Sequence, residues 1–111
     1  MIIRSAYLEG TVPPAQRARF DAHMSGPVMA AIATYPGLRQ AHLRKLIQAD
    51  EGAPSIYMVF DLHFDNLQAM EAALASATRQ AVREIISQGM TLFQGRVYHL
   101  VFDQEQQPVS T

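Results

Sequence analysis

The stretch from Phe20 to Arg39 constrains the fold more than any other part of the sequence. Its apolar residues recur at spacings of three and four, which predicts an amphipathic helix that runs to about Thr34. The residues on this apolar face are Phe20, Met24, Val28, Ala31 and Ile32. Pro36 and Gly37 then end the helix and lead into a strand. The rest of the chain must therefore supply an apolar surface for this helix to cover.

A proline interrupts the helical pattern at Gly26-Pro27. Proline removes one backbone hydrogen bond, and its ring clashes with the carbonyl four residues back, here that of His23. Two outcomes follow: either the helix kinks, or it restarts with Pro27 in a new first turn. Both outcomes free backbone groups beside His23.

Four segments read as strands because they are rich in β-branched and aromatic residues or alternate in polarity. They are residues 2–9, 39–48, 55–64 and 96–103. The clearest is 55–64, where alternation places Ile56, Met58, Phe60, Leu62 and Phe64 on one face. Its other face carries Tyr57, Val59, Asp61 and His63. One face of the sheet is therefore core, and the other is semi-polar.

A second helix follows the third strand. Asp65 or Asn66 is expected to cap it, and apolar residues keep a helical period through about Ser87. Ser76 and Thr78 offer a break with a fresh cap at mid-length. Gly89 is the expected stop.

The order of elements is βαββαβ, which is the ferredoxin-like α+β pattern of a four-stranded antiparallel sheet with two helices on one face. The 111 residues suit one domain. We expect this domain to span residues 1–103, with a polar C-terminal tail at 104–111.

The sheet face that no helix covers is expected to be more apolar than a wet face needs. We place Val59, Val97 and Val101 there, among Tyr57, His63 and His99. Charged residues make up only 17 % of the chain, below the usual quarter. Both observations predict a homodimer that forms through the sheet faces.

Composition excludes several classes of function. The formal net charge is −1, and no Lys/Arg cluster marks a partner such as nucleic acid or an anionic membrane. No cysteine is present, which excludes disulfides and thiolate catalysis. No apolar run approaches the roughly 20 residues of a membrane span, and no signal peptide is visible, so we expect a soluble, cytoplasmic protein. The sequence also lacks phosphate-binding and nucleophile-elbow motifs.

The histidines are the main candidates for chemistry. His23 suits acid–base catalysis, because an imidazole near its ordinary pKa can take or give a proton. The alternative is that His23 only caps backbone freed by Pro27. His42, His63 and His99 lie on three strands without metal-ligand spacing, so we interpret them as interface residues and expect no metal. Asp61 could orient a histidine, but we expect it to pair with Arg4 or Arg44.

A short motif resembles a known family. The phrase F-x-x-H-x-x-x-P at Phe20 to Pro27, followed by P-G-L at 36–38, is similar to the dimeric α+β barrel superfamily. Within it the resemblance is to the EthD-like group, named for ethyl tert-butyl ether degradation, and to the related methylmuconolactone isomerases. Residues 64–76 and the strand entry at 95–98 agree with it. The resemblance implies two sheets packed face to face with the helices outside.

The resemblance also implies a function. It suggests a small enzyme, or enzyme accessory, that acts on a small hydrophobic or aromatic catabolic intermediate by cofactor-free oxygenation or isomerisation. His23 would be the acid–base group, no cofactor would be needed, and the substrate-binding residues would be Tyr7, Phe20, Met24, Phe60 and Leu74. The alternative is a non-catalytic dimeric ligand-binding or stress-response module. A haem-binding version would use His23 as axial ligand.

Overall fold

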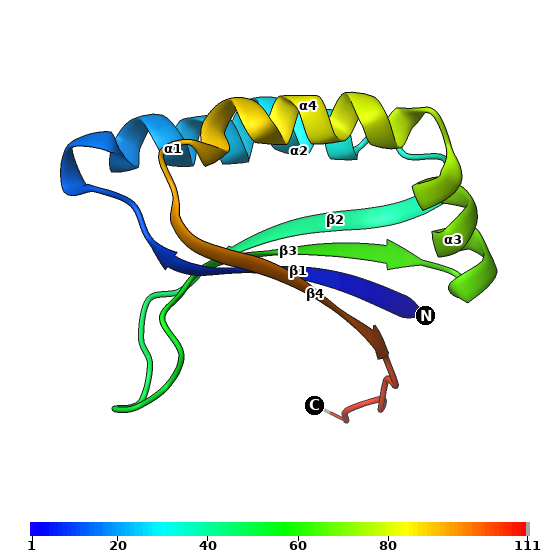
Figure 1. The fold of residues 1–111 in the computed structure, drawn as a ribbon. Helices are drawn as coiled ribbons and strands as arrows, with labels where there is room; N and C mark the ends of the chain where they lie inside the picture. The colour runs from blue at the N-terminus through cyan, green and yellow to red at the C-terminus, as the bar shows by residue number, and fades with distance from the viewer. Residues whose placement is uncertain (111) are drawn as a thin grey trace.

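The computed structural model describes residues 1–110 and shows two layers, a four-stranded sheet with helices along one face (Figure 1). The strands are β1 (Ile2–Thr11), β2 (Leu38–Lys45), β3 (Ile56–Phe64) and β4 (Gln94–Asp103). The helical segments are η1 (Pro14–Gln16), α1 (Arg17–His23), η2 (Met24–Val28), α2 (Met29–Ile32), α3 (Leu67–Ala75) and α4 (Thr78–Met90). None of the helices within residues 1–110 is long and apolar enough to cross a membrane.

The sheet has the strand order β2-β3-β1-β4, and all three neighbouring pairs are antiparallel. Each helical connection passes over one strand, so β1 and β3 lie at the centre and β2 and β4 at the edges. This arrangement confirms the predicted ferredoxin-like α+β fold.

Pro27 neither kinks the first helix sharply nor restarts it. Residues Met24–Val28 form a π-helical turn that joins α1 to α2, and the two run as one rod in Figure 1. The wider turn accommodates a residue that lacks a backbone N–H and clashes with an ordinary i−4 partner. Gly37, at φ +78°, then turns the chain into β2.

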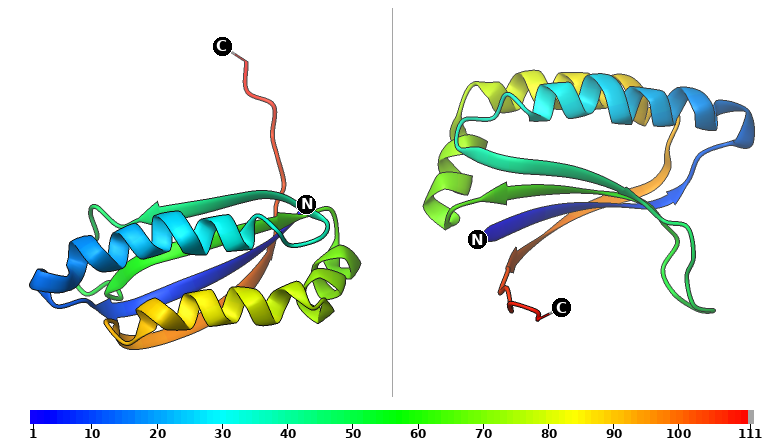
Figure 2. Two further views of the ribbon diagram at one scale, coloured as in Figure 1. Left: turned by 90° about the horizontal axis from the view of Figure 1, so that it is seen from above. Right: turned by 180° about the vertical axis from the view of Figure 1, so that it is seen from behind.

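The second predicted helix is two helices. Asn66 caps α3, and its side chain accepts a hydrogen bond from the backbone N–H of Ala69 at 2.8 Å. Ser76 is extended and separates α3 from α4. The α3 helix sits at one end of the sheet, while α4 runs beside α1 and α2 (Figure 2). Gly89 does not stop α4 as expected; it lies inside the helix and is buried.

The core lies between the helices and the sheet. Its largest fully buried side chains are Phe20, Phe64, Met24 and Met58. The expected faces are wrong at the first two positions of β3, because a bulge opposite Leu8 and Glu9 turns Tyr57 toward the helices and leaves Ile56, paired with Glu9, outside the core. There Tyr57 contacts the ring of Phe20. Bulges of this kind place two neighbouring residues opposite one and so shift the alternation.

The predicted orientation of the edge strand β4 is also wrong. His99 pairs with Ala6, and Val97 pairs with Leu8, so both face the helices rather than the open side. Val101, opposite Arg4, does the same. Pairing register sets the side of every residue in a strand, and a strand with apolar residues on both sides gives no pattern from which to read it.

Candidate functional site

A cavity of about 380 Å³ lies between α4, the α1–α2 rod and the sheet. Its floor is apolar and buried, and consists of Leu8, Met24, Phe60, Leu62 and Val82. Its exposed lining residues are Arg83 and Ser87 on α4 and Val97 and His99 on β4. The cavity therefore opens between α4 and the edge strand, where the helical layer leaves β4 uncovered.

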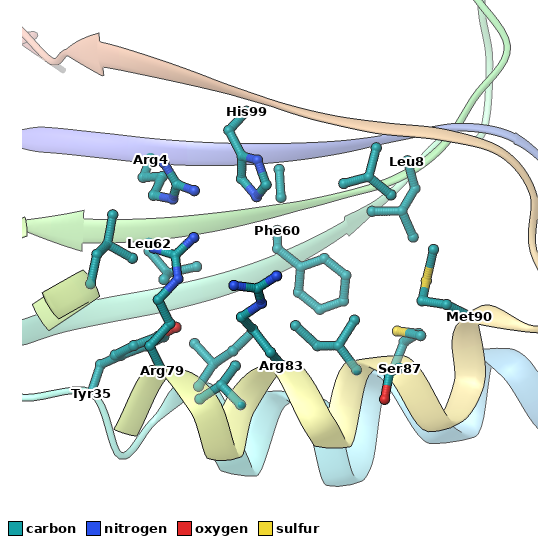
Figure 3. A pocket seen from close by; sticks show the side chains of 17 residues that line it. Arg4, Leu8, Tyr35, Phe60, Leu62, Arg79, Arg83, Ser87, Met90 and His99 are labelled. Carbon is teal, nitrogen blue, oxygen red and sulfur yellow. The ribbon is translucent and has the colours of Figure 1, made fainter. Parts of the chain in front are cut away.

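Five polar side chains gather at one end of this cavity (Figure 3). Arg4 comes from β1 and His99 from β4, where they are diagonal neighbours on adjacent strands. Arg79 and Arg83 come from successive turns of α4, a spacing that puts both on one helix face. Tyr35, from the turn before β2, completes the group and is buried. No Asp or Glu lines the cavity.

The charge at this end is unbalanced. The ion pairs among residues 1–110 are Arg39 with Asp65, Arg44 with Asp61 and Arg96 with Glu9. Arg4, Arg79 and Arg83 take part in none of them. Three cationic groups thus border one partly desolvated space without an opposing carboxylate.

This surplus of positive charge acts on the neighbouring groups. Burial lowers the pKa of Arg4, and the nearby Arg79 lowers it further. Partial desolvation lowers the pKa of His99, and the charges of Arg4 and Arg79 add to this effect. Burial raises the pKa of Tyr35, against the opposing effect of the arginines. At neutral pH, His99 is therefore a neutral imidazole, and Tyr35 keeps its proton.

Three of the residues predicted to bind substrate lie together in the cavity wall: Met24, Phe60 and Leu74. Phe20 lies outside it, packed between Tyr57 and Phe93 with ring-centre distances of 5.6 and 5.8 Å. Tyr7 lies on the opposite face of the sheet. There its ring stacks on Tyr98 at 5.3 Å.

His23 does not line the cavity. Its Nε2–H donates a hydrogen bond to the backbone carbonyl of Ile85 in α4, at 2.7 Å. Gly89 lies against its ring, so close that a Cβ there would come within 2.5 Å of His23 Cδ2. The absence of a side chain at Gly89 therefore lets α4 approach the π turn, and His23 links the two helices.

The sequence reasoning missed Arg4, Arg79, Arg83, His99 and Tyr35 as members of one site. For two of them a signal was present. Arg79 and Arg83 share a helix face with Val82 and Ile86, so two cations stand on a face that is otherwise apolar. The other three come together only through the sheet register and the turn before β2.

The open face of the sheet carries a different polar group. Asp61 accepts hydrogen bonds from Ser5 Oγ and Arg44 Nε, both at 2.5 Å. Pairing with Arg44 was one of the two predicted outcomes, and it is confirmed. Burial alone would raise the pKa of Asp61, but hydrogen bonds from Arg44 and Ser5 outweigh it and lower the pKa.

Two histidines lie beside this carboxylate. The rings of His42 and His63 meet edge to face, with centres 5.1 Å apart. Within residues 1–110 no three His, Asp or Glu side chains are grouped as a metal site requires. His99, on the other side of the sheet, is not part of this pair.

No protein-family model matches the sequence, and no curated protein matches it significantly. Solved structures do match. An ethyl tert-butyl ether degradation (EthD) family protein from Bacillus halodurans is similar over 95 % of this chain and all of its own, with TM-score 0.72 and 15 % identity. SnoaB, described as a cofactor-independent oxygenase from Streptomyces nogalater, is similar over 96 % of this chain and 93 % of its own, with TM-score 0.59 and 18 % identity.

A third similar structure is described as a dimer. It is a dimeric protein of unknown function from Bacteroides fragilis with a ferredoxin-like fold, similar over 93 % of this chain and 96 % of its own, with TM-score 0.61 and 12 % identity. At these identities the similarity concerns the fold. The expected resemblance to EthD-like proteins is thus confirmed as a shared ferredoxin-like architecture.

Proposed function

We propose that the protein is a small enzyme that acts on a small hydrophobic or aromatic compound held in the cavity between the helices and the sheet. One observation carries this proposal: an apolar cavity of about 380 Å³ has polar groups converging at one end. Pockets of this size and lining are typical of small-molecule sites. The fold shared with SnoaB, described as a cofactor-independent oxygenase, supports chemistry by side chains alone.

The reaction we propose begins with removal of a proton from the substrate. His99 lines the cavity, and its lowered pKa makes it a neutral imidazole that accepts a proton at neutral pH. Arg4 and Arg79 stand beside it and stabilise the anion that forms on the substrate. Proton removal of this kind is a first step for both isomerisation and cofactor-free oxygenation.

His23 remains the second candidate for the acid–base role. Its Nε2–H is bonded to the Ile85 carbonyl, and its ring touches Gly89 behind the cavity wall. From this position His23 supports the shape of the cavity, because it holds α4 against the π turn. A direct proton transfer would need the ring to leave Ile85 and turn toward the cavity.

Turnover measurements on two variants separate these roles. Phenolic and lactone compounds are screened for oxygen consumption and product formation with the native protein, His99→Gln and His23→Gln. We expect His99→Gln to lower kcat by about 10²–10⁴-fold, the usual contribution of a positioned acid–base group. His23→Gln should keep most of the activity but unfold at a lower temperature. Unchanged turnover in His99→Gln would refute its assignment.

A non-catalytic ligand-binding module is the second candidate function. The observation that favours it is the backbone hydrogen bond of His23, which gives that residue a structural task. In this case compounds that bind the cavity would come out chemically unchanged. Product analysis after long incubation with a bound compound distinguishes the module from the enzyme.

We also propose a homodimer that packs through the open sheet face. This face carries Leu100 and Phe102, which are 45 % and 43 % exposed. The β2–β3 hairpin and the C-terminal segment both extend to the same side of the sheet (Figure 1), and Ile47 in the hairpin is 96 % exposed. A second sheet would fit between them. Sedimentation tests this: Leu100→Lys should turn a dimer into a monomer, and an Arg19→Lys control should not.

A further inference from the structure

We propose that the ligand of the cavity is an organic acid, with an apolar body and an oxyanion such as a carboxylate that Arg4, Arg79 and Arg83 bind. This inference rests on the proposed small-molecule function of the cavity and names the class of compound. It applies equally to an enzyme and to a binding module.

The first argument is the geometry of the three arginines. Arg79 and Arg83 project from α4 across the cavity, and Arg4 faces them from β1 (Figure 3). A guanidinium presents paired N–H groups that match the two oxygens of a carboxylate. Cations that converge from opposite walls are suited to hold one anion between them.

The second argument is that these charges have no ion-pair partner among residues 1–110. Arg39, Arg44 and Arg96 each bond a carboxylate, although all three are largely exposed. Of the cavity arginines, Arg4 and Arg79 are less exposed and Arg83 lies at the opening, and none of the three has such a bond. Gathering like charges there is unfavourable unless something offsets the repulsion. Because no Asp or Glu lines the cavity, a bound anion is the group that offsets it.

The third argument is the polarity of the cavity along its length. The arginines, His99 and Tyr35 lie toward one end, whereas Leu8 and Met90 lie toward the other, with Phe60 between them (Figure 3). A compound with its charge at one end matches this division. Its apolar part would lie against Phe60 and the methionines, which adapt readily to ring or chain shapes.

The groove on the open face serves as an internal contrast. It is also lined by an arginine and by histidines, but Arg44 there is bonded to Asp61. Its positive charge is already neutralised. We therefore assign anion binding to the cavity between sheet and helices and not to the open face.

A matched pair of probes tests this assignment: 2-naphthoate, which carries a carboxylate, and 2-naphthalenemethanol, which has the same rings and no charge. Binding is measured by calorimetry, and the site is located by chemical-shift changes around Phe60. We expect naphthoate to bind at least about tenfold more tightly than the alcohol, which corresponds to a difference of roughly 1.4 kcal/mol in binding free energy. Added salt should narrow the difference.

Three variants show which arginines cause the preference for naphthoate. Arg79→Met and Arg83→Met remove cavity cations and should abolish the preference for naphthoate. Arg19→Met removes the same charge from the exposed side of α1 and should leave the preference intact. Because Arg83 is exposed, the Arg83→Met variant is expected to fold. If Arg79→Met does not fold, Arg83→Met alone tests whether these arginines bind the carboxylate.

Each remaining outcome has a definite meaning. Equal binding of both probes at Phe60 would overturn the anion site and leave the small-molecule cavity standing. A preference that survives in Arg83→Met would also overturn the assignment to these arginines. Specific naphthoate binding without any turnover would support the anion site while contradicting the enzyme. Failure of both probes to bind would refute the cavity and the anion site together.

Discussion

Both faces of the sheet carry arginine and histidine side chains, but the arginine on the open face is paired with a carboxylate and those on the helical face are not. On the open face, Arg44 meets a buried Asp61, which also bonds Ser5. On the helical face, Arg4 and Arg79 approach each other with no carboxylate nearby. The first arrangement is complete within the chain, and the second is complete only with an anion from outside.

This difference shows how a small domain can separate stability from binding. A buried carboxylate with all its hydrogen bonds made supports the folded state. Unpaired cations in a partly buried cavity weaken it, as residues retained for function commonly do. The predictions below test whether the two faces differ in this way.

The largest effect is expected at Asp61. Asp61→Ala leaves Ser5 and Arg44 without their acceptor and should lower the free energy of unfolding by about 2 kcal/mol. Urea denaturation measures the change. Asp65→Ala is the control, because its pair with Arg39 is exposed and should contribute little. If both variants lose the same free energy of unfolding, the buried hydrogen bonds of Asp61 stabilise the protein no more than an exposed ion pair does.

Arg4 should give the opposite sign. Arg4→Met removes a desolvated cation that faces Arg79 and should raise the free energy of unfolding by about 1 kcal/mol in the absence of ligand. Arg44→Met, on the other face, should lower it. Parallel urea curves for the two variants make the comparison. A loss of stability in both would contradict the difference between the faces.

The position of α4 is predicted to depend on Gly89 and His23. In Gly89→Ala the new methyl group meets the His23 ring, and displacing that ring breaks its bond to Ile85. We expect a net loss of about 1 kcal/mol, because overpacking exceeds the better helix propensity of alanine. In the background of His23→Ala the same change should be stabilising. A double-mutant cycle in thermal unfolding measures this coupling; additive effects would refute it.

The last prediction concerns the pH dependence of binding. The free protein has a lowered His99 pKa, due to desolvation and to Arg4 and Arg79, and a bound anion would raise it. The complex then takes up a proton, so affinity for naphthoate should rise as pH falls through the range between the two pKa values. The rise is at most about tenfold per pH unit. Calorimetry between pH 5 and 8 measures it, and His99→Gln should flatten the profile.

The cavity itself was only partly predictable. Met24, Phe60 and Leu74 could be chosen because helical and strand periodicity puts them on core-facing sides. The alternation of β1 gives no clear core side, because Arg4 and Ser5 lie in its middle. The sequence therefore did not show that Tyr7 lies on the other face of the sheet. His23 was singled out for its place beside Pro27, and local sequence cannot show that its partner is a carbonyl 62 residues away.

The sequence by itself determined the order of elements, the amphipathic first helix, the Pro36-Gly37 exit and the core face of β3, because each depends on residues close together in the chain. Only the tertiary structure decided which side of β4 faces the helices, how the π turn absorbs Pro27, and that Arg4, Arg79, Arg83 and His99 share one cavity. Those features depend on register and on helix approach. Both are set by contacts between segments far apart in sequence, and these leave no local pattern to read.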